Sequence, residues 1–393
     1  MRYRKDEKSG NMLSTLGFGC MRLPRNAAGI DMKKSSQLIS KAVGEGVNYF
    51  DAAYLYPGTE EALGRILSES GLREKVFIAT KLPISICRKA EDFDRFFEAQ
   101  LKRLRTGYID YYLMHNMNTA AQWQSLCALG IEDWLEKQKK SGRISRVGFS
   151  FHGVYGEFEK LIDMYGWDFC QIQYNYSNEN YQAGVMGLRL AADREMPVII
   201  MEPLLGGKLA NGLPKQAEAV FKAANPGLTP ATWGLRWLLN QPEVTVILSG
   251  MNSASQLIEN LHTAENCAAG SLSEKEQGAY KKAVEIFKKS YKIPCTGCGY
   301  CLPCPHGVNI PGCFSAYNTS YSMGHITGMI QYATGTGATK KKNQTAGNCV
   351  GCKKCEGHCP QNIKISAELK RASKRLEPVV FKAAMAAMSR RAK

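Results

Sequence analysis

Eight short apolar segments alternate with helical patterns over the first 270 residues of this 393-residue chain. The segments are rich in β-branched and aromatic residues and lie at 15–21, 47–51, 76–81, 109–115, 147–150, 169–173, 198–202 and 244–249. They are apolar throughout, as is typical of parallel strands that are covered on both faces. Eight repeats in this length predict a closed (β/α)8 TIM barrel rather than an open doubly wound sheet.

Helical patterns fill the gaps between these segments. Amphipathic stretches lie at 35–44, 60–68, 92–103, 123–139, 157–164, 184–194, 230–240 and 254–261. The stretch 205–230 contains GG, NG and PG steps and is predicted to be a long loop after the seventh strand. Loops on that face of a barrel normally carry the functional site.

Nine of the fourteen cysteines lie between Cys295 and Cys359, in two closely spaced runs. The second run reads Cys349-x2-Cys352-x2-Cys355-x3-Cys359-Pro360 and has the spacing of two-cluster bacterial ferredoxins. The first run reads Cys295-x2-Cys298-x2-Cys301-x2-Cys304-Pro305 and lacks one residue before its Cys-Pro. Such spacing lets a short loop bind three corners of an iron–sulfur cubane, while the fourth ligand arrives from elsewhere.

The two runs therefore predict two [4Fe–4S] clusters that exchange their fourth ligands. One cluster would be bound by Cys295, Cys298, Cys301 and Cys359. The other would be bound by Cys349, Cys352, Cys355 and Cys304, with Cys313 as an alternative to Cys304. Structural zinc remains a second interpretation, because paired Cys-x2-Cys units also form tetrahedral zinc sites.

Three segments are expected along the chain: a barrel at 1–270, a helical connector at 271–291 and a small, mainly helical ferredoxin-like iron–sulfur domain at 292–393. Ser273 followed by Glu276 predicts a capping box at the start of the connector. Between the cysteine runs, 310–348 is expected to hold one helix and then a Gly/Thr/Lys-rich loop, and 368–391 is helix-prone.

The formal charge of +16 and the pI near 9.2 would permit nucleic-acid binding. The basic residues are dispersed, apart from 340–342 and the tail with Lys370, Arg371, Lys374, Arg375, Arg390 and Arg391. A solvated helix face is the first interpretation of this tail, a docking surface for an acidic electron carrier (a ferredoxin or flavodoxin) the second, and nucleic acid the third. The polar start and the lack of a long apolar run predict a cytoplasmic protein without a membrane span.

Reactive side chains stand at or just beyond three of the predicted strand ends. These are Asp51 and Tyr56, Lys81, and His115. A tyrosine with an unperturbed pKa of about 10 needs a nearby cation to act near neutrality. Lys81 could supply that cation, Asp51 could hold the lysine ionised, and His115 could orient a substrate carbonyl. Strand-end capping is the structural alternative.

The chain resembles the aldo/keto reductases in four segments that follow in order. They read Leu16-Gly-Phe-Gly-Cys-Met-Arg-Leu-Pro24, Phe50-Asp-Ala-Ala-Tyr-Leu-Tyr56, Ala79-Thr-Lys81 and Tyr112-Leu-Met-His115. The resemblance covers the barrel and is greatest to the branch that is fused to a C-terminal 4Fe-4S module. It implies that Tyr56 is the general acid, that Lys81 and Asp51 tune it, and that His115 orients the carbonyl.

The same resemblance implies positions for an NADP or NAD cofactor. Ser150 and Gln171 would hold the nicotinamide amide. The pyrophosphate would lie along Leu204, Gly206 and Lys208, and the adenosine end would lie in the loop with Gly250, Asn252, Gln256 and Asn260. Met21 would also contact the cofactor. Three departures concern Met201 in place of a stacking tyrosine, Phe151 in place of an asparagine, and Gly250 with Gln256 in place of basic residues. His152 and Tyr176 are expected near the site.

The predicted activity is nicotinamide-dependent reduction of a small carbonyl, or oxidation of an alcohol, with two clusters that exchange electrons with a carrier or the site. Hydride transfer moves two electrons whereas clusters move one, so a flavin is a further candidate cofactor, although no flavin motif is present. Three alternatives stay open: an electron-transfer protein with a scaffold barrel, a reductase with structural zinc, and a nucleic-acid-binding regulator. The substrate and the oligomeric state are not predicted.

Overall fold

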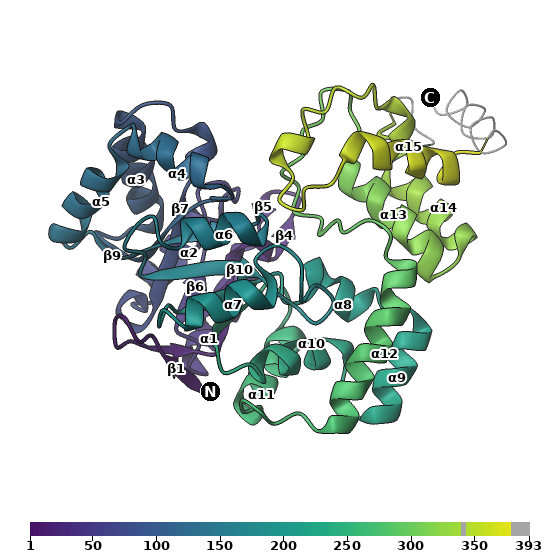
Figure 1. The fold of residues 1–393 in the computed structure, drawn as a ribbon, viewed down its shortest axis with the longest axis horizontal. Helices are drawn as coiled ribbons and strands as arrows, with labels where there is room; N and C mark the ends of the chain where they lie inside the picture. Colours follow the sequence, from purple (N-terminus) through teal and green to yellow (C-terminus); the bar gives the residue numbers. More distant parts are fainter. Residues whose placement is uncertain (339–342, 379–393) are drawn as a thin grey trace. The chain divides into compact units, whose positions relative to one another are not determined.

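The computed structural model describes residues 1–338 and 343–378 (Figure 1). Within these ranges the chain forms two compact units. The first, here called the barrel unit, consists of Met1–Pro203 and Thr232–Leu272. The second, here called the cysteine unit, consists of Leu204–Ala231 and the described residues from Ser273 onward. The predicted boundaries at 270 and 291 stay predictions.

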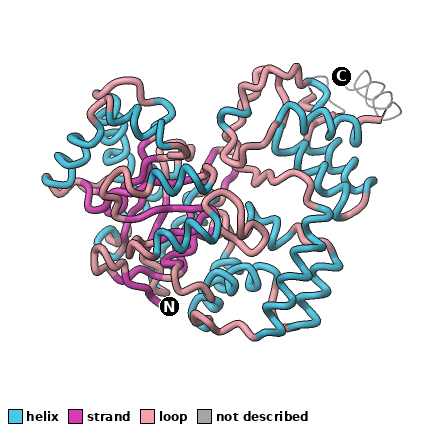
Figure 2. Tube along the Cα trace, viewed as in Figure 1, coloured by secondary structure: helices cyan, strands magenta, loops and turns pink. Residues whose placement is uncertain are grey.

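Eight strands of the barrel unit close into a parallel barrel, in the order β10-β11-β12-β3-β6-β7-β8-β9. Figure 2 shows the strands of this unit in magenta, with cyan helices around them. They are β3 (Leu16–Gly19), β6 (Tyr49–Asp51), β7 (Phe77–Leu82), β8 (Ile109–Met114), β9 (Ile144–Phe151), β10 (Phe169–Gln173), β11 (Val198–Met201) and β12 (Val244–Ser249). Strands that follow one another in the sequence pair around the barrel, and the last pairs with the first. The predicted barrel and its eight strands are confirmed.

Large apolar side chains fill the interior of the barrel. The cluster comprises Leu13, Tyr49, Ala79, Tyr111, Leu113, Phe169, Ile199, Val246 and Leu248. Because side chains alternate along a strand, the residue two places after each of these also faces inward. Lys81 therefore shares a face with Ala79, and Gln171 shares one with Phe169. The same alternation brings the polar side chains of several strands together at the carboxyl end of the barrel.

Helices cover the outside of the barrel. They are α1 (Met32–Gly44), α2 (Thr59–Glu69), α3 (Glu91–Leu104), α4 (Ala120–Cys127), α5 (Ile131–Lys140), α6 (Tyr155–Leu161), α7 (Gly184–Ala192), α10 (Pro230–Leu239) and α11 (Ala254–Asn266). The prediction of one helix over 123–139 was wrong, because the structure has α4 and α5 there. Gly130 has a φ of 83°, a left-handed conformation that ends one helix and precedes the next.

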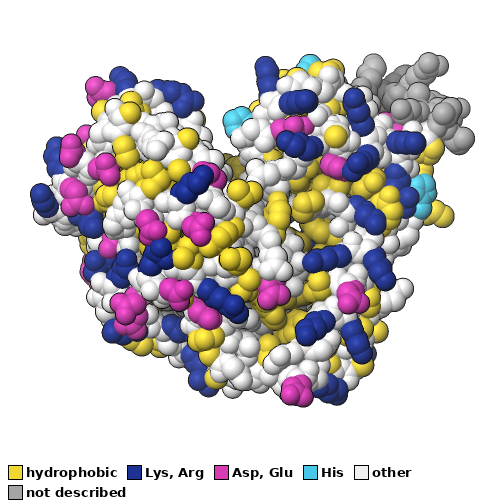
Figure 3. All heavy atoms as spheres, in the orientation of Figure 1, with side chains coloured by type: hydrophobic (Ala, Val, Ile, Leu, Met, Phe, Trp, Pro, Cys, Tyr) yellow, Lys and Arg dark blue, Asp and Glu magenta, His cyan; other side chains and the backbone are white. Residues whose placement is uncertain are grey.

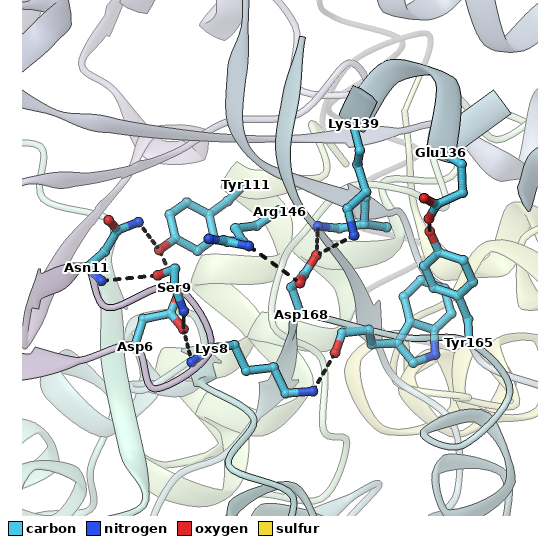
Figure 4. Close-up of polar contacts among 12 residues, drawn as sticks. Asp6, Lys8, Ser9, Asn11, Tyr111, Glu136, Lys139, Arg146, Tyr165 and Asp168 are labelled. Carbon is cyan, nitrogen blue, oxygen red and sulfur yellow. Dashed lines mark hydrogen bonds and ion pairs between the residues drawn. The ribbon is translucent and has the colours of Figure 1, made fainter. Parts of the chain in front are cut away.

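Two short hairpins precede α1 and were not predicted. One pairs β1 (Tyr3–Lys5) with β2 (Met12–Ser14), and the other pairs β4 (Arg25–Asn26) with β5 (Gly29–Ile30). The turn of the first hairpin closes the amino end of the barrel, where the Tyr111 hydroxyl donates to the buried Asp6 carboxylate at 2.8 Å (Figure 4). In the same view Lys8 donates to the carbonyl of Trp167 at 2.9 Å. The opposite end of the barrel, where the strands have their carboxyl ends, is not covered by this hairpin and can hold a functional site.

The cysteine unit is built from helices and irregular loops. Its longer helices are α9 (Lys215–Ala224), α12 (Glu274–Ser290), α13 (Ile310–Ser322), α14 (His325–Gly335) and α15 (Ile365–Leu376). The expected mainly helical character is confirmed, and so is the capping box, in which Ser273 and Glu276 bond reciprocally. The prediction of a loop over 205–230 was wrong, because that segment contains α8 (Lys208–Asn211) and α9, which packs against α12.

The segment between the cysteine runs also differs from its prediction. It contains two helices, α13 and α14, where one was expected. In the tail, α15 ends at Leu376. The basic run 340–342 and the part of the tail from 379, with Arg390 and Arg391, lie outside the described residues.

The surface mixes charges of both signs. On the face drawn in Figure 3, Lys and Arg side chains lie among Asp and Glu side chains on the barrel unit, whereas Lys and Arg predominate on the cysteine unit. Among the described helices, none has both the length and the apolar character that are needed to cross a bilayer.

Candidate active site and cysteine clusters

A buried ion pair anchors the candidate active site. Lys81 Nζ lies 2.6 Å from Asp51 Oδ2 and donates a second hydrogen bond to the carbonyl of Ala52 at 2.7 Å. The two residues are 1% and 4% exposed, so neither charge is solvated by bulk water. Burial raises the pKa of Asp51, and the Lys81 ammonium opposes that rise by favouring the carboxylate.

Tyr56 and His115 stand beside this pair. The Lys81 ammonium lies 5.1 Å from the centre of the Tyr56 ring. The rings of Tyr56 and His115 meet edge to face, with centroids 5.7 Å apart. Tyr56 is half-buried, whereas His115 is buried. The structure therefore brings the four predicted catalytic side chains together, although their roles remain predictions.

The histidines near this site are held neutral by their surroundings. Burial lowers the pKa of His115 well below its usual value, and the positive charge of Lys81 lowers it further. Burial also lowers the pKa of His152 to about 4, opposed by a hydrogen bond with Gln182, whose Oε1 lies 3.2 Å from His152 Nδ1. A neutral His115 can hydrogen-bond a carbonyl oxygen without adding a charge to the site.

A polar network behind Lys81 was missed by the sequence analysis. Glu60, on the first turn of α2, is 1% exposed. Its Oε1 accepts hydrogen bonds from Thr80 at 2.6 Å and from Gln100 at 2.8 Å, and Gln100 also donates to the carbonyl of Lys81 at 3.0 Å. This network fixes the backbone that carries Lys81. Glu60 looked like an ordinary exposed residue of an amphipathic helix, so no signal in the sequence marked it.

Two of the predicted cofactor residues lie side by side on neighbouring strands. Ser150 and Gln171 are paired in the register of β9 and β10. The Ser150 hydroxyl accepts from the backbone amide of Asn116 at 2.9 Å. Gln171 is 2% exposed, and its Oε1 has no hydrogen-bond partner in the described structure. An unsatisfied buried amide at the mouth of a barrel is energetically costly unless a ligand completes it.

The loop after β12 has been assigned by resemblance to the adenosine end. Gln256 accepts from the backbone amide of Asn252 at 2.9 Å, and Asn260 donates to Ser249 at 3.0 Å. A Cβ at Gly250 would lie 3.0 Å from Arg22 Cδ, so the Arg22 side chain packs against this position. Arg22 was not singled out from the sequence. It follows Met21 in a short 3-10 helix after β3, and the contact of its aliphatic stem brings an arginine to the loop in which Gly250 and Gln256 replace the basic residues of the family pattern.

The other predicted cofactor positions belong to the cysteine unit. Lys208 donates to the Ser315 hydroxyl of α13 at 2.9 Å. A Cβ at Gly206 would lie 2.2 Å from the carbonyl oxygen of Thr296, so only glycine allows this close approach. The loop that contains Leu204, Gly206 and Lys208 thus packs on the residue after Cys295.

The departures from the family pattern have different surroundings. Phe151 is fully buried and packs edge to face on Phe158, with centroids 5.1 Å apart. Met201 is half-buried at the end of β11 and pairs in register with Gln173. Tyr176 is buried, and burial raises its pKa.

The first set of cysteines surrounds one hollow. Cys295, Cys298, Cys301 and Cys359 all line it, together with residues that include Pro360 and Ile365. The pKa of Cys295 and of Cys301 is raised to about 12, chiefly by burial and in smaller part by the neighbouring thiols, Cys359 among them. Gly297 and Gly299, with φ of 71° and 84°, let the loop curl around the hollow.

The second set of cysteines is more exposed. The pKa of Cys355 is raised to about 11, chiefly by burial and in smaller part by the nearby Cys304 and Cys349. Cys352 is exposed. Cys313 is fully buried on α13 and lies near Cys349, with its Sγ 3.8 Å from the carbonyl oxygen of Gln344. In the described ranges, no three His, Cys, Asp or Glu side chains converge closely enough to hold a single metal ion.

Comparisons with known proteins divide the chain in the same way. Residues 15–279 match the sequence model of the Aldo/keto reductase family, and residues 294–363 match that of a 4Fe-4S dicluster domain. The chain is similar to an uncharacterized oxidoreductase of Bacillus subtilis, with 26% identity over 67% of this chain and 91% of the relative. It is also similar to a methylglyoxal reductase of Escherichia coli, with 28% identity over 56% of this chain and 78% of the relative.

Solved structures share the barrel fold. A holo aldo-keto reductase from Bacillus halodurans superimposes with a TM-score of 0.60 at 22% identity, covering 72% of this chain and 96% of that one. An NADPH complex of an aldo-keto reductase from Klebsiella pneumoniae gives a TM-score of 0.59 at 23% identity, covering 72% and 95%.

Proposed function

The chain belongs to the aldo/keto reductase family and carries a C-terminal 4Fe-4S domain, and on that premise we propose that this oxidoreductase reduces a small carbonyl with a nicotinamide cofactor. Tyr56 would donate the proton to the carbonyl oxygen. The observation that carries the proposal is the arrangement of Lys81, which is 2.6 Å from Asp51 and 5.1 Å from the Tyr56 ring.

The electrostatics of the four side chains fit proton donation by Tyr56. When its proton leaves, the phenolate is stabilised by the Lys81 ammonium beside the ring. Asp51 keeps the buried lysine charged and aimed. His115, held neutral by burial and by Lys81, would donate a hydrogen bond to the same carbonyl oxygen and fix its direction.

The barrel unit also has groups that suit a nicotinamide. When bound, the reduced nicotinamide supplies the hydride that the carbonyl carbon of the substrate accepts. Gln171 Oε1, buried and without a partner in the described structure, would accept from the carboxamide of the ring, and the neighbouring Ser150 hydroxyl would lie against it. These two residues would orient the ring relative to Tyr56. Arg22 beside Gly250 would favour a 2′-phosphate at the adenosine end.

Two [4Fe–4S] clusters fit the two sets of thiols. Four cysteines around one hollow match the donor set of a cubane, and Cys359 of the second run lies with the first run as the exchanged-ligand pattern requires. The clusters would carry single electrons. Cys313 remains the alternative to Cys304 in the second set.

The more exposed cluster is the proposed contact point for an electron carrier. Cys352 is exposed, and Val350, which follows Cys349 of the same set, is 64% exposed. Lys353 and Lys354 follow Cys352 and are exposed as well. Apolar contact ringed by positive charge suits an acidic one-electron carrier protein, whose approach would be accelerated at low salt.

A pair of tyrosine variants tests the enzymatic part of the proposal. Protein purified without oxygen would be assayed with NADPH and NADH against small aldehydes, starting with methylglyoxal, which the name of the Escherichia coli relative suggests. Tyr56→Phe should lower kcat by about 100-fold or more. Tyr54→Phe is the matched control. Tyr54 lies two residues before Tyr56 in the sequence, but its ring packs on Phe96 instead. Equal activity of the two variants would remove the proposed role of Tyr56.

A further inference from the structure

Helix α14 carries an exposed apolar stripe, here called the α14 stripe and defined as Met323, Ile326 and Ile330. Their exposed fractions are 58%, 74% and 61%. Ile326 and Ile330 stand four residues apart and therefore lie on one face of the helix, and Met323 stands two residues before its start. Gly328 and Tyr332 are buried on the side that contacts α13 and α15 (Figure 1). A helix that is apolar on two sides is typically covered on both.

The α14 stripe has no charged neighbours on its own helix. Helix α14 contains no Lys, Arg, Asp or Glu. On α15, by contrast, the exposed side includes Lys370, Arg371 and Lys374, as is usual for a helix face in water. The carrier proposed above needs positive charge around its contact, which α14 itself does not offer. The amphipathic face of a helix suits the stripe better.

The end of α15 brings the chain to α14. The carbonyl oxygen of Arg375 lies 3.0 Å from His325 Nε2, at the start of α14. Two residues further along, the buried carboxylate of Glu377 accepts a hydrogen bond from the Tyr332 hydroxyl of the same helix. Pro378 is the last described residue of the tail. Residue 379 therefore follows directly from a segment that is held on α14.

The sequence after Pro378 has an apolar pattern that complements the stripe. Residues 379–393 lie outside the described structure. In the sequence, Phe381, Met385 and Met388 recur at i, i+4 and i+7, which is the spacing of one helix face. Five alanines between 383 and 392 add the strongest helix propensity of any residue. A helix over 380–389 would be about 15 Å long, similar to the length of α14, which has 11 residues.

The short connection favours this chain's own tail over a second copy of the protein. Only Glu377 and Pro378 separate the last residue of α15 from residue 379. A short linker holds a tethered segment at an effective concentration in the millimolar range. A second molecule is present only at its bulk concentration and would have to compete with the tethered segment.

We propose that residues 379–391 form an amphipathic helix whose Phe381, Met385 and Met388 dock on the α14 stripe of the same chain. The docked tail would bury the stripe and leave the basic residues of the segment in water. Docking of the tail does not depend on carbonyl reduction, so this proposal and the proposed activity can fail separately.

Docking of the tail would also support the second set of cysteines. The Tyr332 hydroxyl accepts from the backbone amide of Ala346 at 2.6 Å, and Glu377 accepts from that of Gly347 at 2.9 Å. These bonds hold the turn that leads into Cys349. Because Tyr332 belongs to α14 and Glu377 directly follows α15, a tail that fixes α14 against α15 restrains this turn.

Carbene footprinting of the full chain tests the docking. A diazirine is photolysed in protein that is reconstituted and kept without oxygen, and mass spectrometry locates the labelled residues. Met323 and Met186 of α7 are 58% and 59% exposed in the described structure, so without a cover they should label at similar rates. A tail that is undocked about 10% of the time or less should slow the labelling of Met323 about tenfold relative to Met186. Ile330, which is 61% exposed, should be slowed in the same way relative to Ile258 of α11, which is 52% exposed.

Two serine substitutions on the predicted apolar face of the tail should remove this protection. In Phe381→Ser combined with Met385→Ser, Met323 should label as fast as its matched methionine on α7. Ala383→Ser combined with Ala386→Ser is the matched control, because it introduces two serines outside that face. It should keep the protection of the wild type.

Ile330→Ser tests the contact from the side of α14. Labelling of Met385 should rise, whereas Tyr332, which is buried on the other side of the helix, should stay unlabelled. Equal labelling of Met323 and Met186 in the wild type would overturn the proposal. Protection that persists in the doubly substituted tail, or that grows with protein concentration, would also overturn it, because another occupant or a second copy would then cover the stripe.

Discussion

The ammonium of Lys81 lies 2.6 Å from the carboxylate of Asp51, and both side chains are almost completely removed from solvent. A pair buried in this way is held by its own attraction and by the carbonyl of Ala52. Neither charge can be left alone without a large penalty, because a single buried ion has no water to replace its partner. Stability and proton donation therefore depend on the same contact.

Asp51→Asn should destabilise the barrel unit and impair catalysis together. The substitution keeps the size of the side chain and removes its charge, so Lys81 becomes an uncompensated buried cation. Loss of one partner of a buried pair typically costs about 3–5 kcal/mol. The five tryptophans, Trp123, Trp134, Trp167, Trp233 and Trp237, all lie in the barrel unit, so denaturant unfolding followed by their fluorescence measures this loss.

Glu7→Gln provides the control for that measurement. Glu7 pairs with Lys5 at 2.7 Å, but both side chains are about half exposed. An exposed pair contributes about 0–1 kcal/mol, so this variant should unfold almost like the wild type. If Asp51→Asn shows a similarly small change, the pair does not hold the site as described.

Acid should destabilise the barrel unit through its two buried histidines. The pKa of His115 is lowered well below its usual value, and that of His152 is lowered to about 4, chiefly by burial. In the unfolded chain a histidine gains its proton at a pH of about 6.5, so the unfolded state binds more protons below that pH. The free energy of unfolding should fall as the pH drops from about 6.5 toward 4, by about 1.4 kcal/mol per pH unit for each histidine.

Tryptophan fluorescence again reports this transition without interference from the cysteine unit. His152→Gln should remove about half of the slope between pH 6.5 and 4.5, because one of the two groups no longer titrates. His262→Gln, an exposed site on α11, serves as the control and should keep the full slope. An unchanged slope in His152→Gln would contradict the assignment of this group.

The fold was predictable where the sequence pattern is local. The strand segments are continuous apolar runs, and β10 and β12 begin and end where the pattern predicts. The break at Gly130 was missed because the apolar period continues across it, and α8 and α9 were missed because glycine and proline steps surround them. Local patterns indicate the type of an element more reliably than its interruptions.

The residues of the candidate site also fall into those that local sequence could predict and those that it could not. Asp51, Lys81 and His115 could be found because each stands at the end of a predicted strand, and strand ends meet at one face of a barrel. The buried role of Glu60 could not be found, because it depends on Thr80 and Gln100 from other elements. The contact of Lys208 with Ser315 spans 107 residues and depends on the packing of the cysteine unit alone.

Gln171→Leu should separate stability from cofactor binding. The substitution replaces a buried amide whose Oε1 lacks a partner with an apolar group of similar size, so the barrel unit should be as stable as the wild type or more stable. Binding of NADPH should weaken about tenfold, because the carboxamide loses its acceptor. Unfolding followed by fluorescence and a cofactor titration measure the two effects.

Gln100→Leu is the contrasting variant. Gln100 is equally buried, but it donates to Glu60, Thr80 and the carbonyl of Lys81, and accepts from Tyr112. Its loss should lower the free energy of unfolding of the barrel unit. Each buried polar group that is left unsatisfied should cost roughly 1–3 kcal/mol. Weaker NADPH binding in Gln100→Leu than in Gln171→Leu would argue against a direct role for Gln171.

Removal of single cysteines should reveal which thiols share a cluster. Protein reconstituted without oxygen is expected to hold about eight iron atoms per chain, in two [4Fe–4S] clusters. Cys359→Ala removes the fourth thiol of the hollow with Cys295, Cys298 and Cys301, so iron should fall to about four atoms per chain. Cys304→Ala should have the same effect through the other cluster, whereas Cys313→Ala should keep about eight. Iron and labile-sulfide analysis, together with paramagnetic resonance of the reduced protein, distinguishes these cases. Iron loss in Cys313→Ala but not in Cys304→Ala would show that Cys313 on α13, and not Cys304, is the fourth ligand of the second cluster. Zinc in place of iron would exclude both clusters.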